Sequence, residues 1–289
     1  METSEVTRAI GAASSIAASL GLAADDAVVL HNSNKLALRL TPCEVFARVA
    51  PVGQEVAQLE VELAQRLAQV GSPVCKLEPR VDPLVYTRDG FAVTFWSYHE
   101  PLEPHVSAVE YAEALERLHA GMRKVDDVAV PRFTDRITEA QGIVADPALS
   151  PELGEVDRGF LGGRLDDVRR AIEGRGAPEQ LLHGEPHPGN VLSTKYGALF
   201  IDFETCCRGP VEFDLAHVPE GVSEQYPNVD LGLLDECRQL VLAMVAAWRW
   251  DVGDQFPNGR WFGEEFLRTL RAGPPWPTLD AVNSRMNDL

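Results

Sequence analysis

The sequence predicts an α+β fold in two lobes, a β-rich N-terminal lobe over residues 1–97 and a mainly helical C-terminal lobe over 98–289. Three observations lead to this prediction. Short β-prone runs separated by turn residues fill the stretch from Asp26 to Ser97. Apolar residues at three- and four-residue spacing dominate several later stretches, as in buried helix faces. At 289 residues the chain is long enough to build two lobes with a sizeable core.

The first lobe is expected to contain a sheet and two helices. The Ala-rich stretch from Ile10 to Leu22 favours an amphipathic N-terminal helix, since Ser and Gly interrupt it and acidic residues precede it, unlike a signal peptide. A second helix is expected from Gln54 to Val70, with Gly71 as its terminator. The expected strands are Ala27–Leu30, Leu36–Leu40, Val45–Val49, and a hairpin of Leu84–Thr87 with Phe91–Trp96 around Asp89–Gly90.

The second lobe is expected to be built on helices. Ser107–Met122 is amphipathic, and Leu231–Trp248 is so apolar that it predicts a buried helix. The stretch from Glu139 to Glu179 is punctuated by Gly and Pro, with a helix expected only over Leu165–Ile172.

Composition narrows the possible partners. The formal net charge of -18 argues against nucleic acid, because phosphate binding requires a basic face. An acidic surface favours cationic small molecules, although it also serves simply to keep a protein soluble. Five cysteines without framework spacing favour a reducing compartment, so a cytoplasmic location is expected. No apolar run approaches the roughly 20 residues of a membrane span.

The segment from Leu182 to Pro219 is the most informative part of the chain. Two prolines and Gly189 exclude a regular helix near its start and predict a rigid loop. A hairpin follows, with strands expected over 191–193 and 198–203, and it should return Asp202 close to Asn190. Glu185, Asn190 and Asp202 offer an acceptor beside an attacking hydroxyl, a neutral oxygen ligand and a carboxylate ligand. Such a set suits a magnesium–nucleotide site.

Three blocks of this segment resemble the aminoglycoside phosphotransferase family, a branch of the protein-kinase-like fold. The catalytic loop of that family is matched by His183, Gly184, His187 and Asn190, and its metal-binding strand by Ile201, Asp202, Phe203 and Glu204. A later Gly-x-x-x-x-Asp-Leu-Ala pattern is matched by Gly209, Asp214, Leu215 and Ala216. The resemblance implies a protein-kinase-like two-lobed fold.

The resemblance also implies roles for individual residues. Asn190 and Asp202 would hold Mg²⁺ on the phosphates of ATP, and Asp214 would brace the catalytic loop. Glu185 occupies the position of the catalytic base, where the family usually has Asp. His183 belongs to the catalytic loop, more as a structural histidine than as a base. The role of His187 stays open, as does that of Glu204, which could contact a second metal or substrate or be a solvated carboxylate.

The nucleotide contacts are expected from the first lobe. Ser33 and Asn34 match a polar turn of the family that could contact phosphates, although a plain hairpin turn is equally compatible. Arg48 is the cation of the third strand, and Lys35 is a competing candidate that lies early, beside the turn. Glu60 is preferred over Glu62 as the helix partner of that cation. The backbone around Ser97 and Tyr98 would bind adenine.

The activity implied is an ATP- and Mg²⁺-dependent transfer of the γ-phosphoryl group to a hydroxyl of a small, cationic molecule such as an aminoglycoside. Choline-like, amino-alcohol, macrolide and sugar acceptors fit the same motifs. A nucleotide-binding protein without transferase activity is the alternative, since Glu185 replaces Asp, Arg48 replaces Lys and a Gly-rich loop is missing. Zinc deaminase chemistry is excluded, because Cys206 and Cys207 are adjacent rather than in Pro-Cys-x-x-Cys spacing.

Overall fold

A computed structural model describes residues 1–289 except 34, 54–55, 103–105, 126 and 286–289. The chain forms two compact units. The first contains Met1–Val106 and Leu192–Glu204, and the second contains Ser107–Val191 and Thr205–Leu289. The first unit therefore extends past the predicted boundary at residue 97 and also takes up a later segment, because the strands after residue 191 pack with it rather than with the helices.

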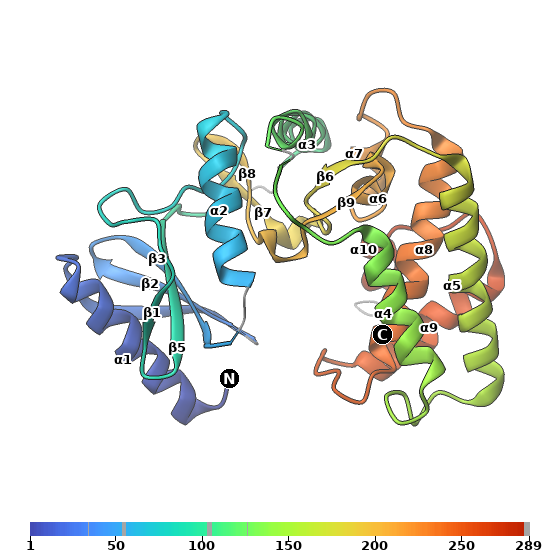
Figure 1. The fold of residues 1–289 in the computed structure, drawn as a ribbon, viewed down its shortest axis with the longest axis horizontal. Coiled ribbons are helices and arrows are strands. Elements are labelled where there is room, and N and C mark those ends of the chain that lie inside the picture. Colours follow the sequence, from blue (N-terminus) through green and yellow to red (C-terminus); the bar gives the residue numbers. More distant parts are fainter. Residues whose placement is uncertain (34, 54–55, 103–105, 126, 286–289) are drawn as a thin grey trace. The chain divides into compact units, whose positions relative to one another are not determined.

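The first unit is built on an antiparallel sheet whose strand order is β1-β2-β3-β5-β4 (Figure 1). Helix α1 (Thr3–Ser19) packs its buried alanines on one face of this sheet. Its start lies earlier than predicted, since the N-terminal polar residues are helical as well. The strands are β1 (Ala24–Asn32), β2 (Leu36–Pro42), β3 (Val45–Pro51), β4 (Tyr86–Arg88) and β5 (Phe91–Ser97).

Alternation along the strands assigns side chains to the two faces of the sheet. Val45, Ala47 and Val49 of β3 are buried in the core beneath α1. Because successive side chains of a strand point to opposite faces, Arg48 points away from α1. Arg48 is paired in register with Ala37 of β2. The second face therefore carries polar side chains, and helix α2 (Val56–Gln69) supplies Glu60 to them.

Two hairpins of the first unit agree with the predicted turn chemistry. Asp89 and Gly90 connect β4 to β5 with φ values of 52° and 84°, as a turn of the primed type requires. Strands β7 (Val191–Thr194) and β8 (Gly197–Phe200) form the later hairpin. The second strand ends before the predicted residue 203. Asp202 has a φ of 66°, which turns the chain out of the strand.

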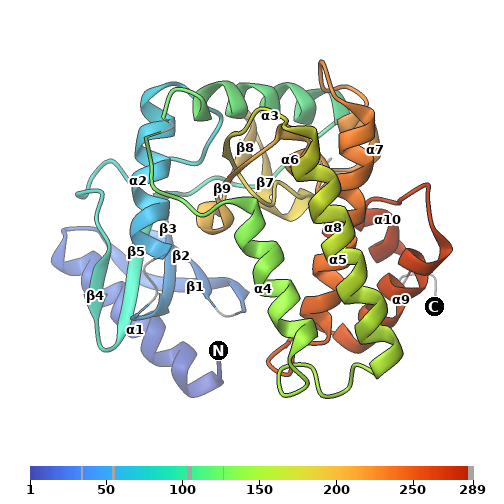
Figure 2. The same cartoon turned by 45° about the vertical axis from the view of Figure 1, so that its right-hand side comes forward.

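The second unit is mainly helical (Figure 2). Helices α4 (Phe133–Ala145), α5 (Glu155–Arg175), α8 (Leu231–Arg249) and α9 (Gly259–Ala272) pack on one another. Helix α3 (Ala108–Met122) begins at the N-cap Ser107, whose hydroxyl accepts a hydrogen bond from the backbone of Glu110. The shorter elements are β6 (Gln180–Leu182), β9 (Cys207–Gly209), α6 (Val211–Leu215), α7 (Glu220–Ser223) and α10 (Leu279–Ser284).

The sequence prediction was incomplete between residues 123 and 179. It missed α4, and it limited α5 to residues 165–172. Helix α5 continues through Gly159, Gly162 and Gly163, because its buried stripe of Leu161, Leu165, Val168 and Ile172 packs on its helical neighbours. Burial of apolar surface thus outweighs the low helix propensity of glycine, which costs about 1 kcal/mol per residue relative to alanine. Within the described ranges, no helix is long and apolar enough to cross a membrane.

Candidate active site

The buried carboxylate of Asp214 holds the loop that starts at His183. Its Oδ2 accepts a hydrogen bond from the backbone N–H of His183 at 2.9 Å, and its Oδ1 accepts one from Gly184 at 2.8 Å. His119 Nε2 lies 2.9 Å from Oδ2. Burial alone would raise the pKa of Asp214, but the hydrogen bonds from His119 and Gly184 bring it below its ordinary value. Asp214 is therefore a carboxylate that fixes the loop backbone.

His119 extends this network, and no sequence motif had indicated it. Its Nδ1 lies 2.8 Å from the hydroxyl of Tyr226. The Tyr111 hydroxyl donates a hydrogen bond to the carbonyl of Pro186, within the loop. Both His119 and Tyr111 come from α3, so this helix supports the loop directly through Tyr111 and indirectly through the His119–Asp214 contact. A helix-periodic pattern had predicted α3 but could not show which of its residues face the loop.

Gly184 and His183 are fixed in place by their surroundings. Gly184 has a φ of 89°, and a Cβ at this position would overlap the carbonyl oxygen of Thr205. No other residue could therefore replace this glycine without moving the chain. His183 is fully buried, and its carbonyl accepts a hydrogen bond from the Thr205 hydroxyl at 3.3 Å. These contacts agree with the structural role expected for His183.

Asn190 follows in a short 3₁₀ turn, η1 (Pro188–Asn190). Its Nδ2 donates to the carbonyl of Glu185 at 2.9 Å and lies 3.3 Å from Nε2 of His187. The other ring nitrogen of His187 accepts a hydrogen bond from Gly189 N at 3.0 Å, so His187 caps the turn. With its NH₂ group engaged within the loop, the amide oxygen of Asn190 is the group left to act as a neutral oxygen ligand.

Glu185 is held by Arg136 of α4. The Arg136 Nη2 donates to the Glu185 carboxylate, and Nη1 donates to the carbonyl of Gly184 at 3.2 Å. Burial alone would raise the pKa of Glu185, but the charge of Arg136 and the nearby His217 and His187 hold it below its usual value. The carboxylate is therefore ionised at neutral pH. Its side chain remains 25% exposed, so an acceptor hydroxyl could reach it.

The first unit carries a cluster of charged groups around Arg48. The Nη1 of Arg48 lies 2.5 Å from Oε1 of Glu60, and its Nη2 lies 2.6 Å from Oδ2 of Asp202. The structure thus brings together the predicted strand cation and the preferred Glu60. Glu62 instead lies near Arg66 on the outside of α2, at 3.4 Å. The Asp202 carboxylate offers the hard oxygen atoms that Mg²⁺ prefers.

Lys35 joins the same cluster, although the sequence had placed it too early to take part. Its Nζ forms an ion pair with Glu204 and lies 3.6 Å from Oε2 of Glu60. Lys35 precedes β2 on the same face of the sheet as Ala37, which is why it reaches the Arg48 side. Glu204 is therefore a paired carboxylate rather than a freely solvated one. Two cations and three carboxylates meet at this site.

The remaining predicted nucleotide contacts have local partners. Asn34 lies outside the described residues. The Ser33 N–H donates to the carbonyl of Lys35 at 3.0 Å, as in a tight turn. The Ser97 N–H donates to the carbonyl of Lys76 at 2.9 Å. The Tyr98 hydroxyl donates to Glu100 at 3.0 Å, and its ring stacks under Arg39. The adenine role of Ser97 and Tyr98 stays a prediction.

Several acidic residues lie in or after the metal-binding motif along the chain. Glu204 belongs to the first unit, whereas Glu212, Glu220 and Glu224 belong to the second. Glu212 accepts a hydrogen bond from the backbone of Asp230 at 3.1 Å.

The adjacent Cys206 and Cys207 are buried free thiols. Burial raises the pKa of Cys207, so this thiol is protonated and unreactive.

Comparison with known proteins supplements this geometry. A family model described as the phosphotransferase enzyme family matches residues 26–270. A search of curated proteins found no match.

Several solved structures have a similar fold. A choline/ethanolamine kinase family protein from Mesorhizobium loti has a TM-score of 0.65 at 15% identity, with 95% of this chain and 96% of that chain covered. The amicoumacin kinase hAmiN has a TM-score of 0.67 at 11% identity, with 89% and 91% covered. Wild-type aminoglycoside 2′-phosphotransferase-IIIa, as a GDP complex, has a TM-score of 0.62 at 16% identity, with 86% and 92% covered. These similarities confirm the predicted protein-kinase-like fold.

Proposed function

Because the chain belongs to the phosphotransferase enzyme family, we propose that it transfers the γ-phosphoryl group of ATP to a hydroxyl of a small molecule. The observation that carries this proposal is the braced loop of the second unit. Asp214 holds its backbone, and Glu185 is presented on it as an ionised carboxylate. A hydrophobic core has no need of buried carboxylates, because burying a carboxylate is costly unless it is paired.

The phosphates of ATP would be bound by the charged cluster of the first unit. Arg48 is an always-charged fork that can bind phosphate oxygens bidentately. Glu60 holds Arg48 at 2.5 Å and so fixes its direction. Lys35 adds a second positive charge to the same face of the sheet. Phosphoryl transfer depends mainly on such positioning and charge stabilisation.

By their chemistry, Asp202 of the metal-binding strand motif and Asn190 of the catalytic loop motif are the residues expected to hold Mg²⁺. Asp202 provides a carboxylate, and Asn190 provides an amide oxygen whose NH₂ group is already engaged within its loop. When bound, Mg²⁺ would neutralise charge on the phosphate oxygens. Asp202 is paired with Arg48. We therefore expect Arg48 to exchange this carboxylate for a phosphate oxygen when the nucleotide binds.

Glu185 would orient the acceptor hydroxyl and accept its proton. Its ionised, partly exposed carboxylate suits this role. We keep a cationic acceptor, such as an aminoglycoside or a choline-like amino alcohol, as the finer part of the proposal, supported by the net charge of -18. A cationic acceptor held by exposed carboxylates should show a KM that rises with salt, because salt screens such pairs.

The test is ADP release by the wild type in the presence of Mg²⁺ and a panel of hydroxyl compounds, namely aminoglycosides, choline-like amino alcohols, macrolides and sugars. We expect acceptor-dependent ADP release for at least one class. Glu185→Gln keeps the shape of the side chain but cannot take a proton, so it should lower kcat by about 10²–10⁴-fold and leave ATP binding nearly unchanged. ATP binding without ADP release from any acceptor would instead indicate a nucleotide-binding protein.

A further inference from the structure

The carboxylate of Glu185 is clamped by a residue that lies outside all three sequence motifs. Arg136 donates from Nη2 to this carboxylate and from Nη1 to the carbonyl of Gly184 at 3.2 Å. The centre of its guanidinium group lies 5.0 Å from the ring centroid of Trp248 on α8. Only 13% of the Arg136 side chain is exposed. The guanidinium is therefore held between the loop and α8.

Such a clamp would compensate for the greater length and freedom of Glu, relative to Asp, at position 185. Glu has one more methylene and one more rotatable bond than Asp, so its carboxylate samples more positions on an unrestrained loop. A misplacement of about 1 Å at a reacting group can cost about 100-fold in rate. A planar guanidinium restricts a carboxylate by direction as well as by distance. Because Nη1 also binds the Gly184 carbonyl, the carboxylate is tied to the backbone of its own loop.

We propose that Arg136 is a positioning residue, which holds the Glu185 carboxylate where the acceptor hydroxyl is to be bound. This inference rests on the proposed phosphotransferase function. It also predicts a dependence between two positions: a chain with Glu at position 185 requires Arg136, whereas the shorter Asp would not reach the guanidinium and would not depend on it.

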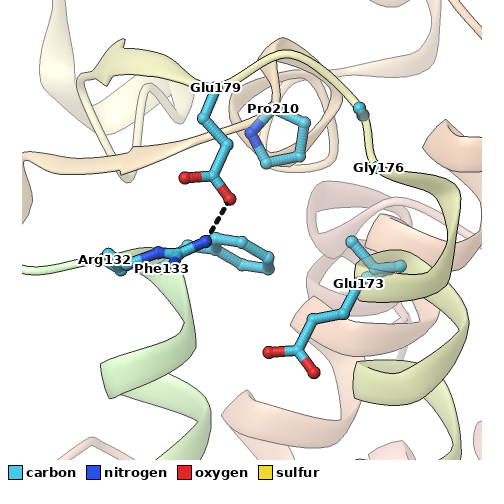
Figure 3. A pocket seen from close by; sticks show the side chains of 8 residues that line it. Arg132, Phe133, Glu173, Gly176, Glu179 and Pro210 are labelled. Atoms are coloured by element: carbon cyan, nitrogen blue, oxygen red, sulfur yellow. Dashed lines mark hydrogen bonds and ion pairs between the residues drawn. The ribbon is translucent and has the colours of Figure 1, made fainter.

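The N-cap residue of the same helix, Arg132, provides a matched control. Arg132 forms an ion pair with Glu179 at 2.6 Å, and the two side chains are 58% and 32% exposed. Figure 3 shows this pair at a pocket lined by Phe133, Glu173 and Pro210. Exposed pairs of this kind contribute little, about 0–1 kcal/mol. Replacing Arg132 thus removes an arginine–glutamate pair from the start of α4 without touching Glu185.

The first experiment measures coupling without requiring activity. Urea unfolding of the wild type, Arg136→Gln, Glu185→Gln and the double variant gives a double-mutant cycle. We expect the double variant to lose less stability than the sum of the two single losses, because each single change leaves a buried group without its partner. Additive losses would overturn the clamp.

The second experiment measures kinetics with an acceptor that shows transfer. Arg136→Gln should lower kcat by about 10–100-fold and change the KM for ATP less than twofold. Arg136→Lys should recover part of the loss, and Arg132→Gln should keep the wild-type kcat. In a Glu185→Asp background, Arg136→Gln should change kcat less than threefold. Should Arg136→Gln fail to fold, Arg136→Lys takes its place, because it keeps the charge but loses the fork, and a wild-type kcat in this variant would then overturn the clamp.

The outcomes separate the clamp from the function on which it rests. An active wild type whose kcat falls less than threefold in Arg136→Gln would overturn the clamp and leave the phosphotransferase function standing. An equal loss of kcat in the wild-type and the Glu185→Asp backgrounds would also overturn it, since Arg136 would then act through the fold. A wild type that transfers phosphate to no acceptor would reject the proposed function, and the unfolding cycle would then decide the coupling alone.

Discussion

Arg48 and Glu60 form a largely buried ion pair on the face of the sheet opposite α1, with 2.5 Å between Nη1 and Oε1. The side chains are 18% and 4% exposed. A buried pair of this kind is costly to break, because removing one partner leaves the other charge without compensation. Glu60 therefore fixes the orientation of Arg48, as the proposed phosphate contact would require.

Arg48→Ala should weaken ATP binding at least about tenfold, since a charge-assisted hydrogen bond contributes roughly 1.5–3 kcal/mol. Calorimetric titration of ATP with Mg²⁺ measures this effect. Arg66→Ala is the control, because Arg66 lies near Glu62 on the outside of α2. This variant should leave the affinity for ATP unchanged. Lys35 also faces Glu60, at 3.6 Å. A larger loss in Lys35→Ala than in Arg48→Ala would transfer the main phosphate contact to Lys35.

Asp202→Asn should remove most of the increase in ATP affinity that Mg²⁺ gives the wild type. The amide keeps the shape of the side chain but loses the charge that a hard cation requires. Titrations with and without Mg²⁺, on the wild type and the variant, measure the difference. Asp82→Asn changes an exposed residue of the same unit and serves as the control. An unchanged Mg²⁺ dependence in Asp202→Asn would contradict the assignment of Asp202 as a metal ligand.

Asp214→Asn should destabilise the second unit, with a loss on the order of 3–5 kcal/mol in the free energy of unfolding. The Asp214 carboxylate accepts hydrogen bonds from the backbone of His183 and Gly184 and contacts His119, and an amide can replace only part of this acceptor set. Urea unfolding measures the loss. Asp167→Asn affects only an exposed pair with Arg170 and should stay within about 0.5 kcal/mol of the wild type. Similar values for the two variants would show that Asp214 does not brace the loop.

The elements with strong local signals could be predicted from the sequence. The strands β1–β3, the Asp89–Gly90 hairpin, α2, α3 and α8 all occur where alternation, turn residues or an apolar stripe had indicated them. Helix α4 carried the stripe of Phe133, Ile137, Ala140 and Val144, but the Pro and Gly residues around it obscured the pattern. Propensity is a weak guide wherever tertiary packing provides most of the helical stability.

The candidate site could be predicted in its motifs and not in its supports. The resemblance to kinases implied the pairing of Arg48 with Glu60, and the structure contains this pair. Arg136 and His119 lie far from the motifs in sequence, and contacts between distant segments leave no local pattern. Lys35 was a candidate because it lies beside the predicted turn, but its pairing with Glu204, 169 residues away, was not indicated. Their roles are defined by which face of a helix or strand meets the loop, and a single sequence does not contain that information.

His217 should make stability depend on pH in a window that a single substitution can remove. Its Nδ1 lies 2.9 Å from the carbonyl of Phe213, and the side chain is buried. Burial, with a smaller contribution from Arg136, lowers the pKa of His217 from 6.5 to about 4, against the opposing charges of Glu185 and Asp214. The imidazole is therefore neutral in the folded protein at pH values where the unfolded chain has already bound a proton.

The sign of the effect follows from proton counting. Between pH 4 and 6.5 the unfolded state binds more protons at His217 than the folded state. The free energy of unfolding should therefore rise with pH across this window, by at most roughly 3.4 kcal/mol, and this contribution should be constant above it. His217→Gln does not titrate, and its amide can donate to the same carbonyl. Urea unfolding from pH 4 to 8 should give a shallower rise for the variant. The pKa values of Asp214 and Glu185 are lowered, so protonation of these carboxylates in acid also reduces the free energy of unfolding. This reduction occurs in the wild type and in the variant alike. Parallel pH profiles for wild type and variant would show that His217 is not a neutral buried histidine.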